Sequence, residues 1–254
     1  MSSIVLFDDG VHKNILLDDY SAGGMVQANQ HLVIHRNAGM ILDPGGHKVY
    51  AKVLAETSGL LTGTGALKYI FLSHQDPDIV AALNGWLMTT DAVAYASKLW
   101  VRFIPHFGID ALVADRLKPI ADGGSVFDLE GAKLLALPAH FLHSCGNFHL
   151  YDPLSRILYT GDLGASLGQG YREVADFDEH IIHMEGFHRR YMASNKVLRA
   201  WAAMVRTLDI EIIAPQHGAL FRGKPMVARF IDWIEELECG IDVLLPEFTV
   251  PSVT

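Results

Sequence analysis

Cysteine is scarce in this sequence: the 254 residues include 2 cysteines, Cys145 and Cys239. Two cysteines cannot build the disulfide framework of a small secreted protein. The N-terminus, MSSIVLFDDG, has no basic start, and Asp8 and Asp9 interrupt its apolar stretch, so it is a poor signal peptide. These absences predict a soluble protein of a reducing compartment, the cytoplasm.

Long apolar runs and clustered positive charge are lacking as well. No run approaches the roughly 18–20 apolar residues that cross a bilayer, so we expect no membrane span. The 29 acidic residues outnumber the 20 Lys and Arg, the formal net charge is −9, and the basic residues form no cluster. General nucleic-acid binding needs a positive surface and is not expected, whereas a local basic pocket for a phosphate remains compatible with the composition.

What the sequence does contain indicates a large folded core. Half of the residues are hydrophobic and 19% are charged, which argues against disorder, and 254 residues are enough for one large α/β domain or two small ones. A Gly/Ser linker, a low-complexity tract and a solenoid-type repeat are all missing. We therefore expect one domain over residues 1–254.

Apolar periodicity and turn residues predict strand-rich stretches followed by helices, twice along the chain. Such an order favours two sheets packed face to face with helices outside. The first half predicts two short strands in 30–43, a helix from the DPGGH turn at 43–47 to about Ser58, strands at 68–72 and 92–97, and a helix over 78–89. After an irregular region at 98–124, the pattern predicts strands at 125–128, 133–137, 147–151, 156–160 and 211–215, a helix over 191–207, and an amphipathic closing helix over 225–245.

Side chains that bind metals follow four of the predicted buried strands. These strands end in His74, His143, Asp162 and His217, in the segments YIFLSH, AKLLALPAHFLH, RILYTGD and EIIAPQH. Because ligands gather where the carboxyl ends of strands meet in an α/β sheet, we expect these side chains to lie close together. The stretch HQDPD adds two carboxylates, Asp76 and Asp78.

Three histidines and three carboxylates form a nitrogen and oxygen ligand set. Such a set suits zinc, iron or manganese better than copper(I) or an Fe–S cluster, which prefer sulfur. Each residue also has a plainer explanation. Asp76 is a good helix N-cap before Pro77, Asp78 complements the helix dipole, Asp162 is ordinary turn chemistry, and His217 before a glycine is a weak signal by itself. The occurrence of all of them at matching strand ends favours the metal site.

The order of the motifs resembles that of the metallo-β-lactamase superfamily over roughly residues 20–245. The motifs are DPGG at 43–46, SHQDPD at 73–78, HFLHS at 140–144, GDLG at 161–164 and APQHG at 214–218. The resemblance implies an α/β fold, the αββα sandwich of two packed mixed sheets with helices outside. Hydrolases of the superfamily usually carry H-x-H-x-D-H in the first motif, whereas a carboxylate at the third position resembles the flavodiiron branch, H-x-E-x-D-H. The HQDPD variant is similar to the stand-alone oxygen-binding di-iron proteins, which have no flavodoxin domain, so no FMN is expected on this chain.

The resemblance also implies roles for the six residues. It implies a bridging Asp162 and two groups of iron ligands: His74, Asp76 and His143 for the first iron, and Asp78 and His217 for the second. The sequence departs from the flavodiiron pattern at two positions: Asp76 replaces Glu and is one methylene shorter, and Ile79 replaces the last His and cannot coordinate. A second metal with so few protein ligands keeps positions open for water, dioxygen or substrate.

Further residues are expected around the metal pocket, each with an alternative. His140 either hydrogen-bonds to a ligand, acts as an outer ligand, or is a surface histidine of its loop. The segment 184–195 holds four candidates just before the predicted helix: His188, Arg189, Arg190 and Tyr191. In the superfamily this segment lies near the metal pocket, and a guanidinium group there fits an anion or a phosphate. The alternative is a charged helix start with Tyr191 packed in the core.

Three functions stay open at this point. The first is a non-haem di-iron protein that binds, senses or reduces dioxygen with an external electron donor or signalling partner. The second is a metal-dependent hydrolase, such as a cyclic dinucleotide phosphodiesterase, in which two metal ions activate water and clamp a phosphate. The third is a non-catalytic, metal-stabilised interaction module. Two metal ions are expected, iron first, with zinc or manganese as alternatives, and a homo-oligomer is expected because relatives of this kind often dimerise.

Overall fold

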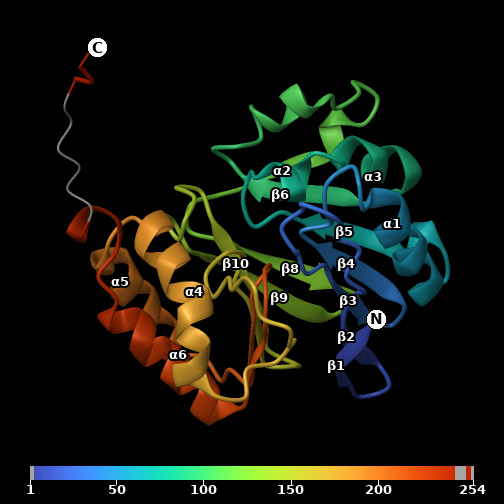
Figure 1. Cartoon of the computed structure of the whole chain (residues 1–254). Helices are drawn as coiled ribbons and strands as arrows, with labels where there is room; N and C mark the ends of the chain where they lie inside the picture. The colour runs from blue at the N-terminus through green and yellow to red at the C-terminus, as the bar shows by residue number, and fades with distance from the viewer. Residues whose placement is uncertain (1–2, 244–249, 253–254) are drawn as a thin grey trace.

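Two β-sheets packed face to face form the centre of the molecule, with helices on both outer faces (Figure 1). The computed structural model describes residues 3–243 and 250–252, and within them one sheet has seven strands and the other has six. In spatial order the seven-stranded sheet consists of β1 (Ile4–Asp8), β2 (His12–Leu16), β3 (His31–His35), β4 (Ala38–Leu42), β5 (Leu67–Phe71), β6 (Val93–Ser97) and β7 (Leu117–Ile120). The six-stranded sheet consists of β13 (Phe221–Arg222), β12 (Ile212–Ala214), β11 (Ile157–Tyr159), β10 (Phe148–Asp152), β9 (Ala132–Pro138) and β8 (Ser125–Leu129).

Both sheets contain parallel and antiparallel neighbours. In the first sheet, β1 to β4 are antiparallel, whereas β4 to β7 run parallel. In the second sheet, β11 and β12 are parallel and the other pairs are antiparallel. This is the αββα sandwich of two mixed sheets that the motifs predict. The parallel pairs matter for function because their carboxyl ends lie at one edge of the sheet, where polar side chains can meet.

Helices cover the outer face of each sheet. Outside the first sheet lie α1 (Tyr50–Leu60), α2 (Pro77–Val80) and α3 (Leu83–Thr89), and outside the second lie α4 (Phe177–Tyr191), α5 (Asn195–Val205) and α6 (Lys224–Glu236) (Figure 1). Short 3₁₀ turns occur at Thr64–Ala66, Ile104–Phe107, Ala114–Arg116 and Gly240–Asp242. Trp86 of α3 and Phe230 of α6 are fully buried against their sheets. Burial of a large apolar side chain stabilises the fold by roughly 1.5–3 kcal/mol, which holds each helical layer in place.

The helices of the second half differ from the prediction. The helix predicted over 191–207 is α5, and a longer helix, α4, precedes it without having been predicted. Two buried positions of α4 carry His180 and His188, so the apolar period that marks a helix is interrupted. Asp176 defines the start of α4, because its carboxylate accepts two N–H groups of the first turn.

The closing helix is also shorter than predicted. α6 ends at Glu236, and positions 244 and 245 of the prediction lie outside the described residues. The side-chain amide of Asn195 donates to the carbonyl oxygens of Glu235 and Leu237, each at 2.9 Å, and so caps the last turn. The helix predicted over 78–89 is divided into α2 and α3, and β1 and β2 precede the first predicted strand.

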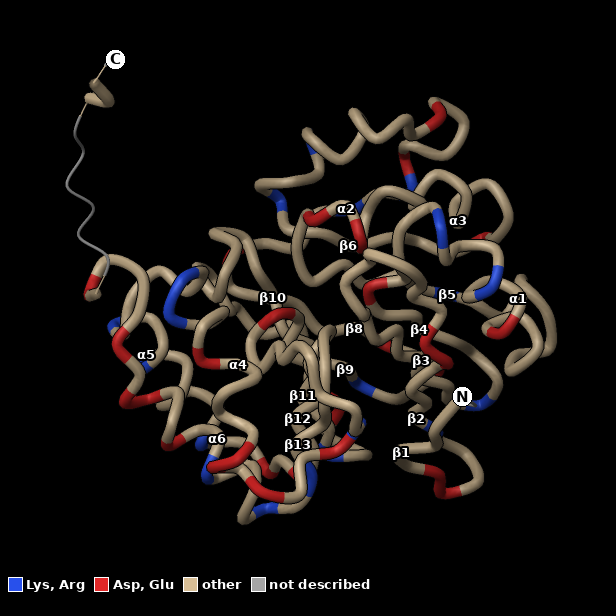
Figure 2. The backbone as a smooth tube through the Cα atoms, in the orientation of Figure 1, with Lys and Arg blue, Asp and Glu red and all other residues tan. Residues whose placement is uncertain are grey.

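The distribution of charged residues over the fold agrees with the sequence, in which the basic residues form no cluster. Figure 2 shows lysines and arginines interspersed with aspartates and glutamates over the described elements of both layers. Among the described helices, none combines the length and the apolar character that a bilayer span requires.

Candidate metal centre

Four loops meet at one edge of the sandwich, and each of them follows a strand. The strands β5, β11 and β12 lead into His74, Asp162 and His217, each three residues beyond the strand's end, and His143 lies between β9 and β10. Gly161 permits the close approach of two of these loops. Its φ is +50°, and a Cβ at this position would lie 3.1 Å from Ser73 Oγ.

Asp162 lies at the centre of the converging side chains. Its Oδ2 is 2.9 Å from His143 Nε2, and its Oδ1 is 3.4 Å from His217 Nε2 and 3.8 Å from His74 Nε2. Its side chain is only 7% exposed. A buried carboxylate that directs its two oxygens at three imidazoles has the position that a ligand shared by two metal ions requires.

The two aspartates of the HQDPD stretch complete the group. Asp76 Oδ2 lies 3.6 Å from the Nε2 atoms of both His74 and His143, and Asp78 Oδ2 lies 3.4 Å from His217 Nε2. α2 begins with Asp76 as its N-cap and proline as its first residue, as the sequence predicts. Within the described chain the Asp76 side chain makes no capping hydrogen bond, so its carboxylate is available to the site. All six side chains that the sequence proposes as ligands are therefore brought together.

The nitrogen and oxygen atoms of the site are better placed to bind a cation than to hydrogen-bond to one another. His74 Nε2 and Asp162 Oδ1 are buried, and neither has a hydrogen-bond partner among the described residues. Four residues each offer one ligand atom, and these atoms all lie within 4.8 Å of one another: His74, Asp76, His143 and Asp162. A buried polar atom without a partner costs roughly 1–3 kcal/mol. A metal ion bound by these atoms would remove that cost, so the residues present fit a metal.

Neighbouring groups contact the Nδ1 atoms of two imidazoles, those of His74 and His217. His74 Nδ1 lies 2.9 Å from Ser73 Oγ, and His217 Nδ1 lies 2.6 Å from the carbonyl oxygen of Gln27. The Ser73 N–H in turn donates to Asp43 Oδ1 at 2.8 Å. Because Asp43 is the first residue of the DPGG motif, this hydrogen bond connects that motif to the site. Such contacts orient each ring so that the Nε2 lone pair points toward the metal position.

Imidazoles and carboxylates shift one another's pKa values strongly here. Burial disfavours the charged form of His74, but Asp162 and Asp76 outweigh burial and raise its pKa to about 9. Burial acts in the same way on His217, and Asp162 again outweighs it and raises the pKa to about 9. Burial alone would raise the pKa of Asp162, yet His74, His143 and His217 hold it well below its usual range. Without a metal ion, the site is thus a buried cluster of opposite charges.

A cavity of about 690 Å³ opens beside the site, and five of the six candidate ligands line it: Asp76, Asp78, His143, Asp162 and His217. Its apolar lining residues include Met25, Val26, Leu167 and Phe187, and Arg190 and Tyr191 line it as well. Phe187 and Tyr191 stack with ring centroids 4.7 Å apart, and both rings pack edge-on against His143. Tyr191 is 57% exposed, so the alternative of a core tyrosine is wrong.

The segment 184–195 ends a helix rather than beginning one, which separates the two arginines. Arg189 and Arg190 lie in the last turn of α4, where positive charge complements the helix dipole. Arg190 lines the cavity, whereas Arg189 is 3.6 Å from Glu185 in an i, i+4 ion pair.

The remaining two histidine candidates differ from each other. His188 is fully buried, and its Nε2 accepts the N–H of Gly164 at 2.8 Å while its Nδ1 donates to the carbonyl of Met184 at 2.7 Å. Burial lowers the pKa of His188 to about 4, so the ring is neutral and supports the loop that carries Asp162. His140 instead lies 2.9 Å from the carbonyl oxygen of Asp122 through its Nε2, the role of a loop histidine.

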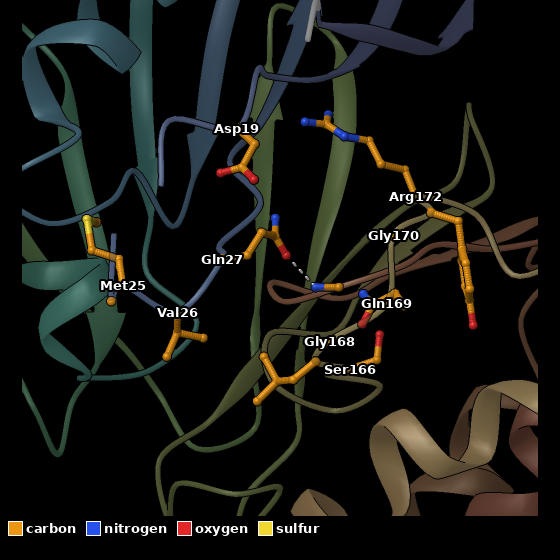
Figure 3. A pocket seen from close by; sticks show the side chains of 13 residues that line it. Asp19, Met25, Val26, Gln27, Ser166, Gly168, Gln169, Gly170 and Arg172 are labelled. Carbon is orange, nitrogen blue, oxygen red and sulfur yellow. Dashed lines mark hydrogen bonds between the residues drawn. The ribbon is translucent and has the colours of Figure 1, made fainter. Parts of the chain in front are cut away.

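A second cavity, of about 480 Å³, shares three lining residues with the first: Met25, Val26 and Leu167. Figure 3 shows this second cavity from close by, with Met25 and Val26 labelled. Gln27 extends along its wall, and Gln27 Oε1 accepts the N–H of Gly218 at 2.7 Å. Because the carbonyl oxygen of Gln27 also faces His217 Nδ1, this one residue holds the His217–Gly218 dipeptide at two points.

Comparison with known proteins identifies the family of the chain. Residues 26–218 match the ODP family beta lactamases. The chain belongs to the ODP family of β-lactamase-like proteins. This membership confirms the resemblance that the motifs carry.

Three individual proteins show how similar this chain is to known relatives. A solved structure described as the peroxy diiron species of chemotaxis sensor ODP is 41% identical, has a TM-score of 0.86, and is matched over 96% of this chain and 98% of that chain. A mutant flavo di-iron protein from Thermotoga maritima shares the fold, with 18% identity and a TM-score of 0.76 over 92% of this chain and 60% of that chain. "Putative diflavin flavoprotein A 2" of Nostoc sp. (strain PCC 7120) is 28% identical over 201 residues, which are 76% of this chain and 33% of that protein. The chain thus spans about a third of the length of this curated relative.

Proposed function

We propose that this chain is a non-haem di-iron protein that binds dioxygen and senses it. The convergence of three imidazole Nε2 atoms and two further carboxylates on Asp162 carries the proposal. In this proposal His74, Asp76 and His143 would hold one iron, Asp78 and His217 would hold the other, and Asp162 would be shared between them. When bound, ferrous iron supplies open coordination positions and the electrons that dioxygen accepts.

The similar proteins support iron as the metal and dioxygen as its partner. The relative at 41% identity is described as a peroxy diiron species and as a chemotaxis sensor. Both properties are extended to this chain as part of the proposal. An external electron donor or signalling partner would reach the site from the open side of the cavity, where Tyr191 is 57% exposed. A homo-oligomer and a single domain over residues 1–254 remain predictions.

The presence of Ile79 favours the binding of a small molecule at the second metal position. It stands where the flavodiiron pattern has a histidine, and its side chain is fully buried in the apolar cluster beneath the first helical layer. The second metal is therefore left with Asp78, Asp162 and His217. These three residues line a cavity that Met25, Val26, Leu167 and Phe187 also line, and such apolar walls favour a small apolar ligand such as dioxygen.

The phosphodiesterase alternative has less support. Two adjacent arginines would make a phosphate clamp, but Arg189 pairs with Glu185 and only Arg190 of the pair lines the cavity within the described residues. A single guanidinium beside a dinuclear site is compatible with a phosphate but does not select it.

Anaerobic loading with Fe²⁺ tests the proposal. We expect two irons per chain and a change in visible absorption when dioxygen is admitted. Zinc-loaded protein is the control, because zinc has no redox chemistry and should give no change. Two bound metals with no response to dioxygen, together with cleavage of a cyclic dinucleotide, would contradict sensing and support the phosphodiesterase.

Two histidines of one loop provide a test of the ligand assignment. His143→Ala should lower metal affinity far more than His140→Ala, because His143 Nε2 is 2.9 Å from Asp162 whereas His140 bonds to a carbonyl of the polypeptide backbone. We expect a loss of more than about 100-fold for His143→Ala, beyond the 10–100-fold that outer partners typically cause. Metal titration by competition with a chelator measures both variants. An equal loss in the two would contradict the assignment.

A further inference from the structure

We propose that Gln75 is a positioning residue that holds Asp76 as a one-oxygen ligand of the first metal. The inference rests on the proposed function only in taking Asp76 as a ligand. The contacts that carry it run from the loop of His143 to the loop of His74. Ser144 Oγ donates to Gln75 Oε1 at 2.6 Å, and Gln75 Nε2 donates to Asp76 Oδ1 at 2.9 Å.

The orientation of the Gln75 amide follows from its surroundings. Ser144 Oγ accepts the N–H of Gly146 at 3.4 Å, so its own proton is free to donate to the Gln75 oxygen. The reverse orientation of the amide would place its oxygen against the Asp76 carboxylate, where two acceptors would face each other. Ser144 is 5% exposed and lies next to His143 in the sequence, which makes it a firm anchor.

As a result, the two carboxylate oxygens of Asp76 have different roles. Oδ1 is occupied by the Gln75 amide, while Oδ2 is left 3.6 Å from the Nε2 atoms of His74 and His143. Ligand atoms 2.0–2.2 Å from one metal at tetrahedral angles lie about 3.3–3.6 Å apart. Both separations from Asp76 Oδ2 therefore match the spacing of two ligands on a common ion, and Oδ2 is the oxygen that Gln75 leaves free for that ion.

A tether of this kind matters more for an aspartate than for a glutamate. Asp76 is one methylene shorter than the residue of the flavodiiron pattern, and its side chain is 35% exposed. A short, partly exposed carboxylate loses its aim when it rotates, and water competes for both of its oxygens. Gln75 removes this freedom before the metal arrives, which is the usual way in which an outer hydrogen bond raises metal affinity.

The other aspartate offers an internal comparison. Gln216 Nε2 donates to Asp78 Oδ2 at 3.1 Å, which is the same oxygen that lies 3.4 Å from His217 Nε2. The amide here shares the oxygen that faces the metal position instead of occupying the other one. Gln216→Leu is thus a matched control, because it removes an amide donor from a site aspartate without touching Asp76.

Titration of the metal-free protein with Co²⁺ tests the inference, since cobalt reports binding by its visible absorption without any oxygen chemistry. In Gln75→Leu we expect one of the two Co²⁺ ions to bind 10–100-fold more weakly, with an altered absorption for that ion, while the melting temperature of the metal-free protein stays unchanged. Gln216→Leu should leave the affinity and absorption of that same ion as in the parent. Ser144→Ala should weaken the same ion as Gln75→Leu, and the double variant should be no weaker than Gln75→Leu alone.

Three results would overturn the inference. Gln75→Leu could bind both ions as the parent does, or Ser144→Ala could cause a further loss in the Gln75→Leu background, which would mean that the hydroxyl acts by another route. A parent chain that takes up no metal would overturn both the inference and the proposed function. A parent that binds two Co²⁺ but, loaded with iron, ignores dioxygen would refute the proposed function and leave the role of Gln75 standing.

Discussion

Replacement of Asp162 by alanine is expected to abolish the binding of both metal ions. The carboxylate lies within 2.9–3.8 Å of three imidazole Nε2 atoms, those of His74, His143 and His217. Without it, each half of the site loses the anion that is buried most deeply, and the second half retains only Asp78 and His217. We expect both affinities to fall by more than about 100-fold, because even the loss of an outer partner typically costs 10–100-fold. Metal content after dialysis and competition with a chelator measure the effect.

Two further variants decide how the loss arises. Asp128→Ala removes an exposed carboxylate that pairs with Lys133 and should leave both metals in place. Asp162→Asn keeps the shape of the side chain and removes its charge, so it should resemble Asp162→Ala if charge is what holds the ions together. Retention of one metal at the parent's affinity in Asp162→Ala would mean that Asp162 serves one ion rather than two.

The convergence of the candidate ligands could be predicted from sequence because most of them follow a buried strand. His74, Asp162 and His217 all occur three residues after a strand end, so one rule about the carboxyl ends of strands locates them together. The αββα layers follow from the same alternation of strands and helices. The local signal and the global arrangement agree here, as expected for residues that both the fold and the chemistry constrain.

The groups that orient the ligands could not be predicted in this way. Gln27 reaches His217 with a backbone carbonyl across 190 positions of sequence, and a backbone carbonyl carries no information about residue type. Gln75 lies within the HQDPD stretch, but its partner Ser144 lies on another loop. Such contacts depend on how the loops pack, which periodicity does not describe.

The arginine pair shows a second limit. Whether Arg189 or Arg190 faces the cavity depends on the phase of α4, and that phase is hidden because His180 and His188 occupy buried positions. In the structure, Arg190 lies one helical turn after Phe187, and both line the cavity. Arg189 instead pairs with Glu185.

Metal affinity is expected to rise steeply with pH up to about 9. The pKa values of His74 and His217 are raised to about 9 in the metal-free site, so near pH 7 both rings carry a proton on the nitrogen that faces the metal position. Binding of the first metal must displace the proton of His74 and binding of the second must displace that of His217, so each affinity should increase about tenfold for each pH unit and level off above pH 9. His217→Ala should leave the slope of the first metal at about tenfold per unit, because the proton displaced there is that of His74. A parent affinity that is flat between pH 7 and 9 would contradict the charged state of these rings.

The stability of the metal-free protein should change in the opposite direction over the same window. The folded-state pKa values of about 9 lie above the ordinary histidine value of 6.5, so the charged rings stabilise the fold fully below pH 6.5 and this contribution is lost as the pH rises through 9. Asp43, whose pKa burial raises to about 6, titrates below the window, as do the neutral buried rings of His31 and His149, whose pKa values burial lowers to about 3. Melting temperatures should therefore fall from pH 6.5 to 9 without metal, while the increase in melting temperature that a fixed concentration of Co²⁺ produces should grow. Opposite slopes in one pair of measurements would attribute both effects to the same two imidazoles, because a general loss of stability at high pH would lower the two curves together.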